Sequence, residues 1–253
     1  MTTKATAHFA KTLAAPIAFL CRRLSPKGYM GLHLTLGMLV LIAGCAIFGE
    51  LTEDVVTHDP SLRVDETVTR FFHERATPGM TTLMKGISFV GSGDFLAPVA
   101  TLLGVYLGWR RRWHRLLMLV LAVGGGTLLN LAAKQAIQRH RPVLENPIVT
   151  LDSYSFPSGH AMAATLFYGL LAVFAVIYLR RWAAKLLVIH LTILVILLVG
   201  FSRIYLGAHY LSDVLGAIAA GAAWLALIVT AVASYRSRKE HRARRRLSPH
   251  SRS

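Results

Sequence analysis

The sequence contains few acidic residues, few charged residues of any kind and almost no cysteine. Among 253 residues, Asp and Glu number 12 against 28 Lys and Arg, and charged residues make up 16% of the chain, whereas a soluble domain has about a quarter. Hydrophobic residues make up 54%, and the mean hydropathy is +0.51. This composition excludes a disordered or fibrous chain and argues against a nucleic-acid partner. The two cysteines, Cys21 and Cys45, exclude a disulfide scaffold.

Six apolar stretches account for the low charge. Each has roughly 16–24 residues, enough for a helix through about 30 Å of hydrocarbon. The stretches are continuous rather than alternating, which favours helices over barrel strands. We therefore predict an all-α polytopic membrane protein with six transmembrane helices in a bundle and an outward-facing active site. The predicted spans cover residues 32–49, 94–109, 116–133, 161–179, 186–201 and 211–234.

Basic residues gather on one side of these spans. The chain before the first span, the 110–115 and 180–185 loops and the chain after residue 235 hold 20 of the 28 Lys and Arg residues. The positive-inside rule therefore predicts that both termini are cytoplasmic. The predicted parts are a cytoplasmic segment over 1–31, a membrane domain over 32–235 and a basic cytoplasmic tail over 236–253. Within the domain, residues 50–92 are interpreted as an outer cap with a structural role.

Three polar clusters lie at the outward ends of the last four spans, where polar residues are costly and therefore informative. The clusters are Lys134-x6-Arg141-Pro142, then Pro157-Ser158-Gly159-His160, then Ser202-Arg203-x5-His209-x3-Asp213. On the predicted topology all three meet at one membrane face, which predicts a functional site there. Arg139 and His140 are interpreted instead as side chains that extend to the membrane interface.

The first two clusters have features of an anion site. Lys134 and Arg141 are seven residues apart, so a continuous helix would place them on one face, and Pro142 would end that helix. Ser158 and Gly159 open the next span, where a serine caps the helix and free N–H groups receive an anion. Cations beside a helix N-terminus form a cradle for phosphate.

The histidines supply the reactive groups. His209 and Asp213 are four residues apart and are neighbours on a helix. The carboxylate can accept one imidazole N–H and leave the other nitrogen basic. Taken alone, this pair is also compatible with a structural contact inside the bundle, and His160 with a helix cap. Their occurrence together at one face favours a nucleophile and a proton donor.

The three clusters resemble the signature of the type 2 phosphatidic acid phosphatase superfamily, which includes vanadium haloperoxidases and glucose-6-phosphatase. All parts are present in order, separated by 14 and 41 residues. The resemblance implies that His209 attacks phosphorus to form a phosphohistidine, that Asp213 orients it, and that His160 protonates the leaving alkoxide. It also implies a set of phosphate-binding groups: Lys134, Arg141, Ser158, Gly159 and Arg203. No metal and no cofactor is implied, in keeping with the lack of an HExxH motif or an acidic cluster at the three motifs.

The expected function is therefore that of an integral membrane phosphatase acting on a lipid phosphate within the bilayer. Candidate substrates are undecaprenyl pyrophosphate, phosphatidic acid and phosphatidylglycerol phosphate, because the signature recognises the phosphate and not the lipid tail. A lipid phosphotransferase would share every catalytic residue, and a non-catalytic lipid-binding or transport protein is the alternative from another class. The sequence leaves the oligomeric state open.

Overall fold

The structure, a computed structural model, describes residues 29–145, 147–149 and 151–247. The regular secondary structure of this part of the chain is all helical, with no strand, which confirms the predicted all-α class. Residues 1–28 of the predicted N-terminal segment and residues 248–253 of the predicted tail lie outside the described residues.

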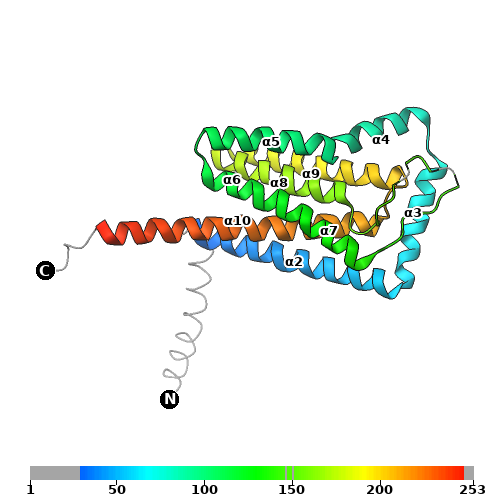
Figure 1. The fold of residues 1–253 in the computed structure, drawn as a ribbon, viewed down its shortest axis with the longest axis horizontal. Coiled ribbons are helices and arrows are strands. Elements are labelled where there is room, and N and C mark those ends of the chain that lie inside the picture. Colours follow the sequence, from blue (N-terminus) through cyan, green and yellow to red (C-terminus); the bar gives the residue numbers. More distant parts are fainter. Residues whose placement is uncertain (1–28, 146, 150, 248–253) are drawn as a thin grey trace, which may run out of the picture.

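Six elements are long and apolar enough to cross a membrane, as predicted. Figure 1 shows them running alongside one another, with the short helix α3 (Arg63–Glu74) lying across one end. A single 3-10 turn, Pro60–Leu62, precedes α3. The spanning elements are α2 (Tyr29–Thr57), α4 (Pro78–Val90) with α5 (Gly93–Trp109), α6 (Trp113–Leu119) with α7 (Gly125–Ile137), α8 (Gly159–Tyr178), α9 (Trp182–Tyr205) and α10 (Leu211–Leu247).

The second span is twice as long as the sequence predicted. It covers Pro78–Trp109, because the apolar helix α4 precedes α5. The two helices meet where the Ser92 Oγ accepts a hydrogen bond of 3.2 Å from the Phe95 N–H, which starts α5 anew. The first span also continues further than predicted, to Thr57. The stretch between the first two spans therefore reduces to residues 58–77, which contain the helix α3.

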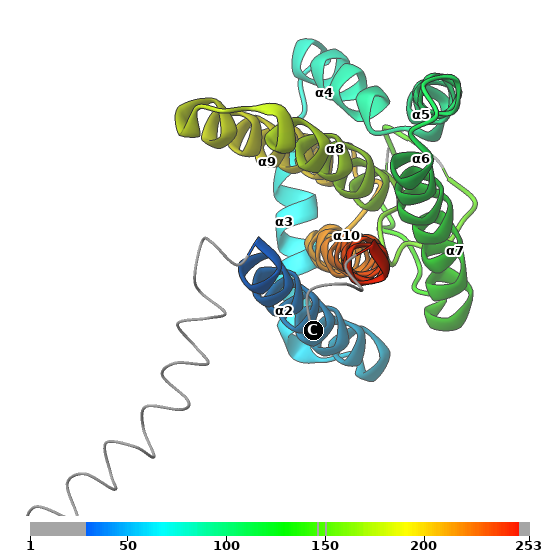
Figure 2. The same cartoon turned by 90° about the vertical axis from the view of Figure 1, so that its left-hand side faces the viewer.

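The helix α10 lies at the centre of the bundle, against α2 and α8 (Figure 2). A Cβ atom on Gly44 of α2 would lie 2.7 Å from the Ala219 carbonyl oxygen, so these two helices touch through their backbones. The triple glycine of the third span, Gly124–Gly126, lies at a change in helix geometry and at a close helix contact. The helix widens into a π-helical turn at Val120–Gly124, and a Cβ on Gly126 would lie 2.2 Å from Leu166 of α8.

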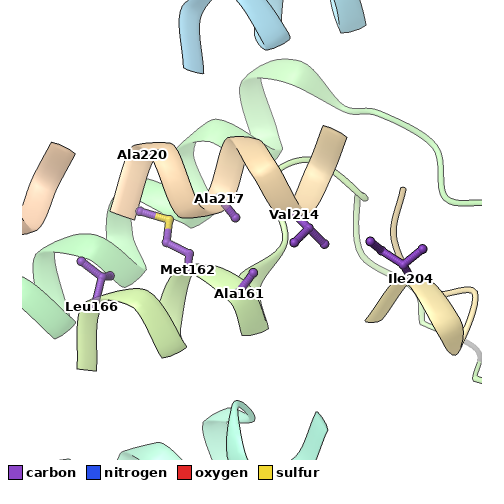
Figure 3. Packing of buried hydrophobic residues seen from close by; sticks show 7 residues of the cluster. All are labelled: Ala161, Met162, Leu166, Ile204, Val214, Ala217 and Ala220. Atoms are coloured by element: carbon purple, nitrogen blue, oxygen red, sulfur yellow. The ribbon is translucent and has the colours of Figure 1, made fainter. Parts of the chain in front are cut away.

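The principal core cluster lies beside the predicted site residues. It joins α8, α9 and α10 through seven buried side chains, which Figure 3 displays: Ala161, Met162, Leu166, Ile204, Val214, Ala217 and Ala220. Three of these follow His160, Arg203 and Asp213 directly in the sequence. Close packing of the apolar neighbour therefore restricts the movement of each functional side chain.

The two ends of the bundle differ in charge. The connections around 110–112 and 179–181, the described start of α2 and the C-terminal part of α10 lie at one end, on the left in Figure 1. The three polar clusters lie at the other end, beside α3. The predicted tail begins as a continuation of α10, which extends to Leu247.

Candidate active site

The turn between α9 and α10 carries His209 into the interior. Gly207 has a left-handed φ of +68°, and a Cβ there would lie 2.4 Å from Leu144, so glycine is required for this turn. The N–H groups of Ala208 and His209 both donate to the Arg203 carbonyl, at 3.0 and 3.3 Å. His209 is 1% exposed as a result.

His209 and Asp213 form the pair that their spacing predicted. The His209 Nδ1 lies 3.3 Å from the Asp213 Oδ2, and the same oxygen accepts hydrogen bonds from the Tyr210 N–H, at 2.9 Å, and from the Ser155 hydroxyl. Asp213 therefore fixes the imidazole by one nitrogen, and the other nitrogen, Nε2, lies 3.3 Å from Arg141 Nη1. Ser155, which sequence reasoning missed, is fully buried at the centre of this arrangement.

The second oxygen of Asp213 is held by Arg139, and here the interpretation of Arg139 as an interfacial side chain is wrong. Arg139 Nη1 donates to Asp213 Oδ1 at 2.6 Å, and Nη2 donates to Asp65 Oδ2 of α3 at 2.8 Å. The guanidinium group also lies over the Tyr210 ring, 4.3 Å from its centroid. The region interpreted as a purely structural cap thus supplies Asp65 to the site.

The three predicted cations reach the site from different elements. The expectation that Lys134 and Arg141 share a helix face is wrong, because α7 ends at Ile137 and Gln138 adopts a left-handed conformation. Lys134 donates from α7 to the Tyr154 carbonyl, whereas Arg141 lies in the following loop, with its Nε 2.6 Å from the Ser153 carbonyl. Arg203, on α9, donates to Ser88 of α4 at 2.6 Å.

The start of α8 differs from the prediction in one respect. Ser158 occupies the N-cap position before Gly159 but makes no side-chain cap hydrogen bond. Its backbone N–H donates instead to the Asp213 carbonyl at 3.0 Å. Among the described residues, the Ser158 Oγ and the Arg203 Nε are two of only four buried side-chain N or O atoms that have no hydrogen-bond partner.

His160 lies in the first turn of α8, beside the same groups. The positive charges of Arg203, Arg141 and Lys134 and the ring of His209 all act on it electrostatically. The structure thus brings together every residue that the sequence proposed for the site. These cations, the unpartnered Ser158 hydroxyl and the Arg203 Nε are groups of the kind that bind an anion.

Burial and neighbouring charge determine the protonation of the groups outside the spans. Burial lowers the pKa of His209 to about 4, even though Asp213 acts in the opposite direction. The imidazole is therefore neutral at neutral pH. Burial also disfavours the charge on Arg139, but Asp213 and Asp65 outweigh that effect and raise its pKa. Among the residues that the structure describes, no group of three His, Cys, Asp or Glu side chains is arranged to hold a metal ion.

Fold and site together are those of a membrane protein with a buried histidine–carboxylate pair among cationic side chains, and the comparisons with known proteins give its class. The PAP2 superfamily matches residues 115–237. The chain is also 37% identical over 159 residues to phosphatidylglycerophosphatase B of Bacillus subtilis (strain 168), covering 62% of this chain and 77% of that relative. The chain belongs to the PAP2 superfamily, and it is a membrane lipid phosphatase of the PAP2 type.

Two solved structures share its fold. One is the transmembrane PAP2 type phosphatidylglycerolphosphate phosphatase from Bacillus subtilis, with a TM-score of 0.67 and 32% identity over 74% of this chain and 93% of that chain. The other is Aquifex aeolicus LpxE, with a TM-score of 0.51 and 23% identity over 64% of this chain and 93% of that chain.

Proposed function

We propose that this enzyme hydrolyses lipid phosphates through a phosphohistidine on His209. The Nε2 nitrogen attacks phosphorus, a P–N bond forms, and the P–O bond to the lipid breaks. His160 gives its proton to the departing alkoxide. Water then attacks the phosphohistidine, His160 takes a proton from that water, and the P–N bond breaks to release inorganic phosphate. No group other than water is consumed.

The observation that carries this proposal is the one-sided restraint of His209. Asp213 and Ser155 lie at Nδ1, at 3.3 and 3.4 Å, so Nδ1 carries the proton and Nε2 keeps its lone pair. Nε2 faces the Arg141 guanidinium, a group suited to binding phosphoryl oxygens. A nucleophile, its orienting carboxylate and a cation for the phosphate are thus within one hydrogen-bonded set.

In this proposal, five residues stabilise the transferring phosphoryl group. Their common feature is a positive charge or an N–H or O–H donor, and such donors act most strongly in a site that excludes water. The proposed phosphate-binding residues are Lys134, Arg141, Ser158, Gly159 and Arg203. We assign no metal to this step and no cofactor to the enzyme.

The preferred substrate is phosphatidylglycerol phosphate, and the support for this choice is similarity. The curated relative is named a phosphatidylglycerophosphatase, and the solved relative with 32% identity a phosphatidylglycerolphosphate phosphatase. Phosphatidic acid and undecaprenyl pyrophosphate remain candidate substrates. The site lies at the end of the bundle away from the basic loops, so we place it on the periplasmic or extracellular side of the plasma membrane.

The test measures phosphate release by the purified protein, in detergent, from these three lipids at matched concentrations. Release that is fastest with phosphatidylglycerol phosphate supports the substrate assignment, and labelled phosphate transferred to an added lipid alcohol instead of water would indicate a phosphotransferase. His209→Ala should abolish both turnover and labelling of the protein. His190→Ala is the control, because that exposed histidine bonds only the Leu186 carbonyl of its own helix. A labelled His209→Ala protein would contradict the proposed nucleophile.

A further inference from the structure

Arg139 lies between two buried carboxylates that come from opposite parts of the chain. Its Nη1 donates to Asp213 Oδ1 at 2.6 Å and its Nη2 to Asp65 Oδ2 at 2.8 Å. The side chains are 11% exposed for Arg139, 5% for Asp65 and 0% for Asp213. Charges this far from water are retained only where hydrogen bonds satisfy them.

Asp65 also accepts hydrogen bonds from Ser212 at the start of α10. Its Oδ1 accepts a hydrogen bond of 2.9 Å from the Ser212 N–H, and its Oδ2 accepts one from the Ser212 hydroxyl. The Ser212 oxygen in turn lies 2.6 Å from Arg139 Nη1. One carboxylate of α3 therefore holds both the residue next to Asp213 and the guanidinium group that touches Asp213.

In this arrangement each oxygen of Asp213 has a different partner. Oδ2 faces the His209 imidazole, and Oδ1 faces Arg139. A carboxylate that orients a histidine works only if it cannot rotate, and outer partners of this kind fix such ligands. Asp65 lies outside residues 115–237, the part that matches the PAP2 superfamily.

We propose that Asp65 and Arg139 are positioning residues that lock the Asp213 carboxylate against His209, so that α3 is part of the catalytic machinery. The inference rests on the proposed roles of His209 and Asp213. Neither Asp65 nor Arg139 touches the reacting phosphorus in this scheme. Their loss therefore lowers the rate of phosphohistidine formation and leaves the affinity for the phosphate nearly unchanged.

The charge of Arg139 provides a second test of this role, through the pH dependence of the reaction. Charged and titratable groups from several elements face His209 and Asp213. They are Arg203 on α9, His160 on α8, Lys134 on α7, Arg139 and Arg141 in the 138–158 loop, Tyr210 in the turn before α10, and Asp65 on α3. Removing the Arg139 cation leaves the Asp213 charge less compensated, although Arg141 and Arg203 remain, and a stronger negative charge beside His209 favours the protonated imidazole. The acid limb of the pH profile of kcat then moves to higher pH. A purely structural contact would not move it.

The experiment compares Asp65→Asn, Arg139→Gln and Arg139→Lys with the wild type, using purified protein and phosphatidylglycerol phosphate in detergent. We expect kcat to fall by about 10- to 100-fold in the first two variants, with KM within about twofold and partial recovery in Arg139→Lys. The double variant should lose less than the product of the two single losses, because both act on one network. Glu74→Gln, an exposed carboxylate on the same helix, is the charge-matched control.

Two results would overturn the inference. One is a folded Asp65→Asn protein with wild-type kcat, and the other is an Arg139→Gln protein whose acid limb stays at the wild-type pH. If Asp65→Asn does not fold, Ser212→Ala tests the same link, and an unchanged kcat there also contradicts it. Full activity in His209→Ala would instead contradict the proposed function, so the two failures are distinguishable.

Discussion

The carboxylate of Asp213 accepts hydrogen bonds on both oxygens while its side chain is entirely buried. At the scale of single residues, this concentration of donors keeps the group charged and oriented without water. The sequence predicted the contact with His209, because four residues separate the two on one helix. It did not predict Asp65 or Arg139, which lie 148 and 74 positions upstream of Asp213. Pairing between such distant residues leaves no periodic signal.

The pH dependence of phosphoenzyme formation follows from the burial of His209. Burial lowers its pKa to about 4, so the neutral, nucleophilic form prevails above that value. The rate should not fall through protonation of His209 between pH 8 and 5, and it should fall as the pH approaches about 4. Rapid-quench measurement of labelled enzyme across this range tests the expectation. A loss centred near the ordinary histidine pKa of about 6.5 would contradict it.

The two serines of the site should respond differently to alanine. The Ser155 hydroxyl donates to Asp213, so Ser155→Ala should lower kcat about tenfold through loss of a hydrogen bond to a charged group. The Ser158 Oγ has no protein partner, so Ser158→Ala should leave the melting temperature unchanged and raise the inhibition constant of vanadate. Thermal unfolding and vanadate titration of both variants check this. Equal effects on vanadate would show that the two hydroxyls share one role.

Activity should survive a chelator. The positive charges of Lys134, Arg141 and Arg203 provide the stabilisation that Mg²⁺ provides in other phosphoryl-transfer sites. We expect full turnover in excess EDTA and inhibition by vanadate, which mimics the in-line transition state. Phosphate release before and after EDTA treatment measures this. Activity abolished by EDTA and restored by Mg²⁺ alone would require a metal in the mechanism.

At the scale of elements, apolar runs predicted the spans well, whereas the residues expected to start or stop helices were a weaker guide. The number of spans follows from hydropathy, although the α4 half of the second span was missed. The end of α7 was misplaced because Pro142 seemed to be its stop, whereas the helix already ends at Ile137 with Gln138 in a left-handed conformation. A glutamine in that conformation has no reliable sequence signal, since glycine or asparagine usually occupies it. Ser158 occupies the N-cap position as predicted, but its hydroxyl makes no cap hydrogen bond, and its backbone N–H donates to the Asp213 carbonyl in a tertiary contact.

The contact between α2 and α10 can be tested with a matched pair of glycines. A Cβ on Gly44 would lie 2.7 Å from the Ala219 carbonyl and 2.9 Å from the Ala223 Cβ, whereas one on Gly49 would meet nothing within 4 Å. Gly44→Ala should therefore destabilise the protein by about 1–3 kcal/mol. Gly49→Ala should be neutral or stabilising, because alanine favours the helix. Thermal unfolding in detergent distinguishes them, and equal melting temperatures would contradict the close contact.

At the scale of the whole molecule, the charge gradient and the site lie at opposite ends. The site is built from loops and helix ends at one end of the bundle, while the basic connections lie at the other (Figure 1). The positive-inside rule predicts that the basic end stays in the cytoplasm. On the orientation that we propose, the charge gradient also determines which leaflet presents substrate to the proposed nucleophile His209.

Cysteine labelling tests this orientation. Val143→Cys introduces a thiol at a position 95% exposed in the loop before α8, at the site end, and Arg111→Cys introduces one in the basic loop between α5 and α6. Both are made in a background with Cys21 and Cys45 changed to serine. In intact bacteria, a membrane-impermeant maleimide should label Val143→Cys and should label Arg111→Cys only after permeabilisation, because the bilayer separates the two loops. The reverse pattern would place the site in the cytoplasm, and the substrate would then have to be presented from the inner leaflet.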